Sequence, residues 1–316
     1  MQGIDAFRVL AFIFVVALHA DRTNLPTDLV LTLETLPRFG VPYFFLTAGY
    51  FLKIDGVTPL ALAAKLLKRL LPIYSLWVLV YLAVNRAVFG NFGISKIGSL
   101  FLDGGPGYHL WFIPALGLSI FTVFLIARTF GDRTLLVVCL CLFVIGTYFI
   151  EFLEPFGPPL PWKFFRNGPF FGAIFVALGY LIRKHHWHPR LGLGLTLFTG
   201  GFLISLGERF ALASAGLISP TESINYTYGT IAFGVGAFAL ALNLPSNARL
   251  VQNMAGLGRL TLGFYCIHLL FLWFVQWMLG PESTVTLLIA IAATTVLSIT
   301  AILLVSRLKW SAPLIR

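Results

Sequence analysis

The sequence predicts an all-α, polytopic membrane helix bundle of about ten transmembrane helices, with both termini cytoplasmic. Of 316 residues, 58% are hydrophobic and only 11% are charged, and the mean hydropathy is +0.90. A soluble domain carries roughly 25% charged residues. The composition therefore excludes an ordinary soluble domain, a disordered chain and a secreted disulfide scaffold.

Apolar runs bounded by charge, Pro or Gly predict the individual spans. Two of them, the second and the sixth, are short for a complete crossing of about 20 residues. No hydrophilic block is long enough for a separate soluble domain, so we expect a single transmembrane domain over residues 1–316 with no appended soluble domain. The ten predicted spans are Ile4–Ala20, Phe39–Phe51, Leu71–Phe89, Leu110–Phe130, Leu135–Phe152, Phe170–Ile182, Leu191–Leu206, Tyr228–Leu244, Leu260–Leu279 and Val285–Val305.

The basic residues divide unevenly between the two sides of this model. Of 22 Lys and Arg, seven fall in the odd-numbered connections, fourteen in the even-numbered connections and the C-terminal tail, and Arg8 in the first span, when Arg86 and Arg128 near span ends are counted with the connections that follow. Because cytoplasmic loops carry the excess of Lys and Arg, both termini are predicted to be cytoplasmic. The net charge of +10 is thus a topology signal, and no nucleic acid partner is expected.

The first predicted span contains ionisable residues, which are costly in lipid and are functional candidates. It carries Asp5, Arg8 and His19, and Asp5 is expected to pair with Arg8, three residues on. Eleven residues make about three helical turns, so Arg8 and His19 share one helix face, ~16.5 Å apart along the axis. Alternatively, Arg8 snorkels to the cytoplasmic headgroups and His19 merely ends the helix at the outer interface.

Two later spans carry histidine beside aromatic residues. His109 precedes Trp111 at the outer end of the fourth span, where an interfacial histidine beside a membrane-belt Trp is the alternative interpretation. His268 follows Tyr265 in the ninth span at a depth of ~13 Å from Arg259, for which we favour an inward-facing role.

Two basic segments face the cytoplasm in this topology. Lys65, Lys68 and Arg69 either anchor the topology or form a site for an anionic, phosphate-bearing ligand. The segment Lys184–His188 has the histidine content of a metal site but lies in a short turn with no accompanying carboxylate, so no metal is expected.

Six segments, taken in order, resemble the acyltransferase 3 family, integral membrane proteins that transfer acyl groups, usually acetyl, to extracytoplasmic carbohydrate. The resemblance runs almost from end to end. Two departures concern Ala48 and Tyr50, where the family usually has Ser and Phe, and the Lys-rich basic segment, where Arg-x-x-Arg is expected. The six segments are Asp5-x-x-Arg8 with His19, Phe44–Leu52, Arg69–Tyr74, His109–Phe112, Phe170–Tyr180 and Gly263–His268.

The resemblance implies a donor, an acceptor and a set of roles. Acetyl-CoA is the implied acyl-donor substrate, a sugar or polysaccharide is the implied acceptor, and a bacterial inner membrane is the implied location. His19 acts as general base or transient acyl carrier, and His109 orients the acceptor or assists His19. The remaining residues either hold the phosphates of CoA (Arg8, Lys65, Lys68 and Arg69) or support the site (Asp5, Trp111, Tyr265 and His268).

Two alternatives to an enzyme stay open at this point. Intramembrane His and Arg could form the path of a proton-coupled secondary transporter, although no internal repeat is visible. The chain could also be a non-catalytic component of an envelope polysaccharide synthesis complex. For an enzyme, the predicted outer connections Asn91–Tyr108, Glu151–Pro169 and Gly207–Asn225 would carry acceptor specificity.

Overall fold

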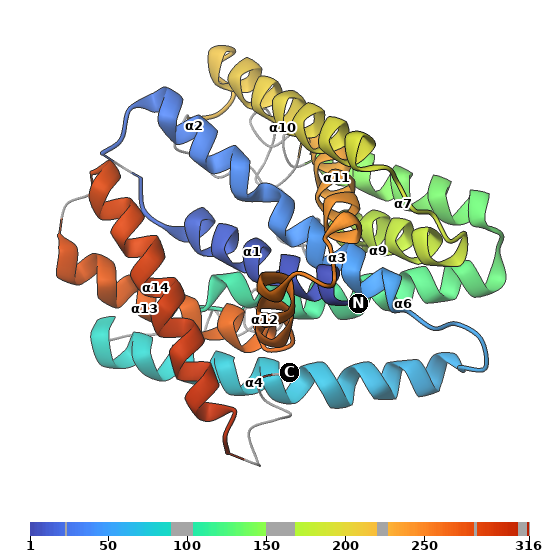
Figure 1. The fold of residues 1–316 in the computed structure, drawn as a ribbon, viewed down its shortest axis with the longest axis horizontal. Helices are drawn as coiled ribbons and strands as arrows, with labels where there is room; N and C mark the ends of the chain where they lie inside the picture. Colours follow the sequence, from blue (N-terminus) through green and yellow to red (C-terminus); the bar gives the residue numbers. More distant parts are fainter. Residues whose placement is uncertain are drawn as a thin grey trace. The chain divides into compact units, whose positions relative to one another are not determined.

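A computed structural model describes residues 1–22, 24–89, 104–149, 168–219, 227–280, 283–308 and 315. Over these residues the regular structure is entirely helical, as predicted (Figure 1). Most of the three outer connections expected to set acceptor specificity lies outside the described residues. The helices are α1 (Gln2–His19), α2 (Thr27–Thr35), η1 (Leu36–Phe39), α3 (Gly40–Tyr50), α4 (Pro59–Phe89), η3 (Tyr108–Trp111), α6 (Phe112–Thr129), α7 (Asp132–Thr147), α9 (Pro169–Lys184), α10 (Leu191–Ser214), α11 (Gly229–Asn243), α12 (Arg249–Gly258), α13 (Thr261–Leu279) and α14 (Thr284–Val305).

Six stretches of the described chain are long and apolar enough to cross a membrane: α1, most of α4, η3 with α6, α10, α13 and α14. Each of the ten predicted spans overlaps a helix. Among the described residues, four of these helices are shorter than a full crossing, namely α3, α7, α9 and α11. Two boundaries were wrong. Helix α10 ends at Ser214, eight residues after the predicted end at Leu206. Helix α4 begins at Pro59, twelve residues before the predicted start at Leu71, so the basic segment is helical and not a connection.

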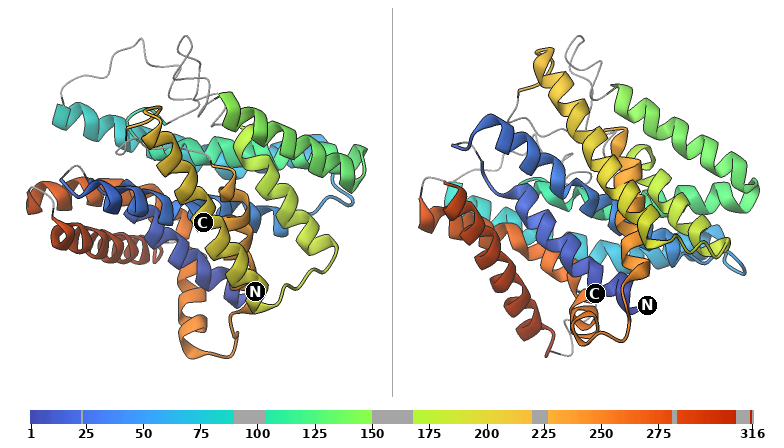
Figure 2. Two further views of the ribbon diagram at one scale, coloured as in Figure 1. Left: turned by 90° about the horizontal axis from the view of Figure 1, so that it is seen from above. Right: turned by 45° about the horizontal axis from the view of Figure 1, so that its top comes forward.

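The chain forms two compact units. The first consists of Met1–Phe44 and His188–Arg316, and the second of Phe45–Trp187. The boundary falls inside α3. In the first unit α1 lies against α13 and α14, which run side by side in opposite directions (Figures 1 and 2). Their shared apolar core consists of Phe12, Val16, Leu260, Phe264, Ile302 and Ile315.

Close backbone contact joins α10 to α11 in the first unit. A Cβ atom added at Gly201 would lie 2.2 Å from the Phe233 nitrogen, and one at Gly229 would lie 2.6 Å from the Ser205 nitrogen. Without water to drive association, helices in lipid gain contact area by such close approach, which small residues permit. The high glycine content therefore determines this packing.

The same device joins α3 to α9 in the second unit. A Cβ atom at Gly49 would lie 1.9 Å from the Val176 carbonyl oxygen, and one at Gly179 would lie 2.0 Å from the Leu46 carbonyl oxygen. Both glycines belong to segments that carried the family resemblance. At each of these glycines the backbone of the other helix occupies the space that a side chain would need, so α3 and α9 pack closely.

Candidate functional site

The first turns of α1 carry an ion pair. Arg8 Nη1 donates to Asp5 Oδ1 at 2.7 Å, as the three-residue spacing predicts, and both side chains are partly buried. Helix α12 packs against this turn, since a Cβ atom at Gly258 would lie 1.9 Å from the Asp5 carbonyl oxygen. The pair neutralises a charge in the span.

The opposite end of α1 brings His19 against His268 of α13. The ring centroids are 5.4 Å apart and the planes meet at 33°. His268 is fully buried, whereas His19 is half-buried. Two imidazoles from helices far apart in the sequence therefore share one site within the first unit.

A backbone carbonyl determines the tautomer of His268. Its Nδ1 lies 2.5 Å from the Tyr265 carbonyl oxygen. A carbonyl oxygen can only accept, so Nδ1 donates and, in the neutral ring, Nε2 bears the lone pair. The Tyr265 ring, at 5.8 Å, and the Phe12 ring, at 6.1 Å, pack against the same imidazole. His268 is thus fixed in orientation and chemically suited to accept a proton at Nε2.

A buried ionic cluster that was not predicted from the sequence adjoins this end of α1. Arg22 donates to Glu34 Oε1, and Arg38 Nη2 donates to Glu34 Oε2 at 3.1 Å. Arg22 and Glu34 are each only 6% exposed. All three lie between the first two predicted spans, where the sequence predicts an outer connection. The four-residue spacing of Glu34 and Arg38 was the available signal, but nothing local points to Arg22.

The same Arg22 guanidinium also binds the end of α1. It donates to the carbonyl oxygens of Ala17 and Leu18, the latter at 3.3 Å. The last four carbonyl groups of a helix lack partners within the helix and carry its negative dipole end, so a cation is favourable there. Arg22 therefore holds the turn that presents His19.

His109 lies in the second unit, on η3. Gly104 N–H donates to the Tyr74 hydroxyl at 3.1 Å, which fixes the start of this segment to α4. His109 is fully buried, and its ring contacts Tyr81 edge-on at 5.1 Å. Trp111 contacts Phe171 at 6.1 Å. Tyr81 is thus a neighbour of His109 that the sequence did not predict.

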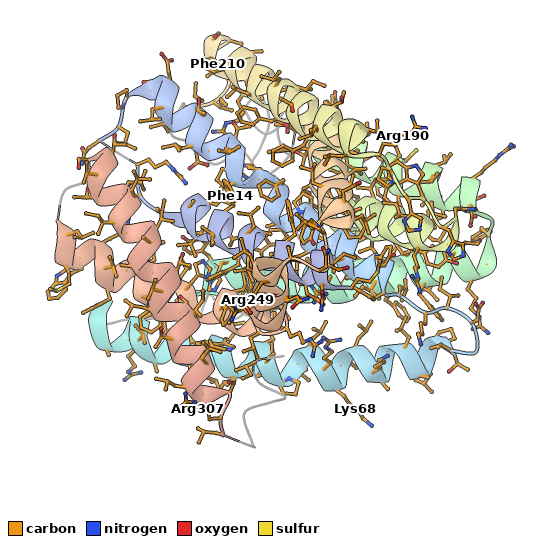
Figure 3. All side chains as sticks on the ribbon, viewed as in Figure 1. Phe14, Lys68, Arg190, Phe210, Arg249 and Arg307 are labelled. Atoms are coloured by element: carbon orange, nitrogen blue, oxygen red, sulfur yellow. The ribbon has the colours of Figure 1, made fainter. Side chains whose placement is uncertain are left out.

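The three basic residues Lys65, Lys68 and Arg69 lie within little more than one turn of α4, and all three are exposed. Figure 3 shows the Lys68 side chain projecting away from the helix. They are accessible to an anionic ligand. Of the predicted site residues, the first unit thus contains Asp5, Arg8, His19, Tyr265 and His268, and the second contains Lys65, Lys68, Arg69, His109 and Trp111.

The histidine-rich turn after α9 has a carboxylate, contrary to the sequence analysis. Asp132, at the start of α7, accepts from Lys184 Nζ at 2.7 Å and lies 2.8 Å from His185 Nε2. The hydrogen bond from Lys184 lowers the pKa of Asp132 and raises that of Lys184. The observed role of this cluster is to tie α7 to α9.

Comparison with known proteins gives one family and a set of partial relatives. The family model described as "Acyltransferase domain" matches residues 1–306. A serine/alanine racemase of Enterococcus gallinarum is 30% identical over 204 residues, which are 58% of this chain and 29% of that protein. An amino-acid racemase of Enterococcus faecalis is 31% identical over 202 residues, 56% of this chain and 28% of that protein.

The matched part is therefore less than a third of the length of these relatives. No solved structure matches the chain. The family model, in contrast, covers nearly all of it, including both histidines of the α1–α13 pair and the η3 segment. The chain belongs to the acyltransferase 3 family of membrane acyltransferases.

Proposed function

We propose that this protein transfers an acetyl group from cytoplasmic acetyl-CoA to a hydroxyl or amine of an extracytoplasmic or lipid-linked sugar. The observation that carries the proposal is the contact of His19 with the buried, orientation-fixed His268, on the same helix that carries the Asp5–Arg8 pair near its other end. One helix thus offers a cation for the donor's phosphates and an imidazole for the chemistry.

The separation of these groups fits a donor that never crosses the membrane as a whole. Arg8 and His19 are eleven residues apart on a continuous helix, or ~16.5 Å along its axis. Candidates to bind the phosphates of CoA are Arg8 in the first unit and the exposed Lys65, Lys68 and Arg69 in the second unit, the lysines acting as point charges. The thin pantetheine arm would carry the thioester inward, so no phosphate enters the ~30 Å of hydrocarbon.

In the transfer step His19 takes the proton of the acceptor hydroxyl as its oxygen attacks the thioester carbonyl carbon. The C–O bond forms, the C–S bond breaks, and the CoA sulfur leaves with the proton from His19. Imidazole suits this work because its ordinary pKa lies near neutrality. In the covalent variant an imidazole nitrogen attacks first, and an acetyl-imidazole then reacts with the acceptor.

His268 acts in this scheme as a positioning residue for His19. Its ring is held by the Tyr265 carbonyl and by Phe12, so it limits the rotation of the neighbouring imidazole. Arg22 would serve the same purpose from the other side, since it binds the carbonyl groups of the turn before His19. Catalytic groups need such fixed supports to keep a productive geometry.

Ligand protection and one substitution test the proposal. Acetyl-CoA at 100 times its Kd should stabilise the purified protein by about 2.7 kcal/mol, by mass action. A transporter or scaffold would show no response to CoA. His19→Ala should abolish acetyl transfer while the protein still inserts and folds, whereas His188→Ala, at an exposed histidine outside the site, should remain active. A fully active His19→Ala variant would overturn the mechanism.

The acceptor requires an experiment in cells. Mass spectrometry of envelope glycans from strains with and without the gene would give the acceptor and the mass of the acyl group together. The expected difference is the loss of one acetyl mass from a single glycan class. An unchanged glycan profile would argue against a carbohydrate acceptor.

A further inference from the structure

Two hydroxyl groups on α14 are buried without a hydrogen-bond partner among the residues that the structure describes. They belong to Thr294 and Ser298, both fully buried. Their neighbour Thr295 behaves ordinarily, since its hydroxyl donates to the Ile291 carbonyl oxygen at 2.8 Å, four residues back. A Ser or Thr within a helix usually makes this bond. Two exceptions on one helix therefore need an explanation.

Both residues belong to the buried face of α14. They are four residues apart and share this face with Leu287, Ala290 and Ile302. The helix packs against α13 and α1, the two helices that carry His268 and His19. The hydroxyl groups are thus on the face of α14 that packs on the histidine-bearing helices.

Helix geometry gives the depth of the two hydroxyl groups relative to His268. Ile302 lies beside Gly263 on the antiparallel α13, since a Cβ atom there would be 3.1 Å from Ile302 Cγ2. His268 is five residues further along α13, or ~7.5 Å from that level. Ser298 and Thr294 are four and eight residues back along α14, or ~6 and ~12 Å from the same level. They therefore lie on either side of the depth of His268.

A purely structural role does not account for this arrangement. A buried hydroxyl without a partner costs free energy that an apolar side chain of the same shape would not, and lipid supplies no water to satisfy it. Retaining two such groups at the depth of the proposed chemistry is favourable when a ligand that enters supplies the missing hydrogen bonds.

We propose that Thr294 and Ser298 form a hydrogen-bonding pair for the secondary amide groups of the donor's pantetheine arm. This inference rests on the proposed function. The arm carries two amides, each with an N–H donor and a C=O acceptor, and a hydroxyl can both donate and accept. Both residues lie near the middle of the 22-residue α14. The arm must pass this depth to bring the thioester to His19, whereas of the acceptor only the hydroxyl that reacts with the thioester needs to reach it.

Substitutions that remove one hydroxyl and keep the shape test the pair. Thr294→Val and Ser298→Ala should each raise the KM for acetyl-CoA by about three- to tenfold, the loss expected for one neutral hydrogen bond. The KM for the acceptor should not change. Unfolding of the ligand-free variants should occur at the same temperature as in the wild type or higher, because an unsatisfied polar group is removed. Thr294→Ser, which keeps a hydroxyl group, should have the wild-type KM for acetyl-CoA.

Thr295→Val is the matched control on the neighbouring residue. Its hydroxyl is already bonded to Ile291, so its removal should leave the KM for acetyl-CoA unchanged. A shift of the acceptor KM instead of the donor KM would overturn the assignment to the arm. Unchanged kinetics, or lower stability of the ligand-free Thr294→Val variant, would show a structural or water-binding role. If the wild-type protein itself shows no thermal response to acetyl-CoA, the proposed function fails, and this inference fails with it.

Discussion

Two adjacent glycines on α10, Gly200 and Gly201, should change the free energy of unfolding in opposite directions when each is replaced by Ala. A Cβ atom at Gly201 would lie 2.2 Å from the Phe233 nitrogen, 1.2 Å inside the 3.4 Å at which ordinary contact begins, whereas a Cβ atom at Gly200 would meet nothing within 4 Å. Because Gly201 faces backbone and not a movable side chain, α10 and α11 must separate. Overpacking of this kind costs about 1–3 kcal/mol.

Gly200→Ala should instead stabilise the protein. Gly200 is half-buried with open space around its added Cβ atom, and such a helical position gains about 0.5–1 kcal/mol when Ala replaces Gly, because the unfolded chain loses backbone freedom. The free energies of unfolding of the two variants should therefore differ by about 1.5–4 kcal/mol. Thermal unfolding of the purified variants in one detergent measures this difference, with the wild type between them. If both variants shift in the same direction, or if Gly201→Ala is as stable as the wild type, the proposed backbone contact between α10 and α11 is wrong.

Two further predictions concern charged groups. Glu34→Gln should destabilise the protein by about 3–5 kcal/mol, because Arg22 and Arg38 lose their buried carboxylate; an unchanged unfolding temperature would contradict the buried pair. Lys184 lowers the pKa of Asp132 from 3.8, so their contribution to stability is complete above that value and is lost as the pH falls through the lowered pKa. Asp132→Asn should therefore lower the stability at pH 7 by at most about 1 kcal/mol, since the pair is partly exposed, and should have no effect in strong acid; an effect of equal size at both pH values would exclude this linkage.

The helical architecture was predictable because apolar runs and their boundaries report directly on what lipid tolerates. Each predicted span overlaps a helix, and the spacing of Asp5 and Arg8 predicted their ion pair. The start of α4 was predicted wrongly because Lys65, Lys68 and Arg69 are polar. Hydropathy measures where a helix enters lipid, whereas hydrogen bonding determines where the helix begins.

The glycines show a second limit of sequence reasoning. Gly49 and Gly179 were recognised within separate segments of the family resemblance, but their contact was not. A glycine in a span looks the same whether it faces another backbone, like Gly201, or open space, like Gly200. Only the packing of the helices distinguishes the two.

The sequence by itself determined the membrane class, the helical fold and the face of α1 that carries Arg8 and His19, because helix periodicity and hydropathy are local properties. The tertiary structure decided which groups meet: His268 with His19, Arg22 with Glu34, and the depth of Thr294 and Ser298 beside them. These contacts join residues from different helices, and a helix turned about its axis buries a different face. Helix packing determines which face is buried, because close approach, buried charge and hydrogen bonding must be satisfied together.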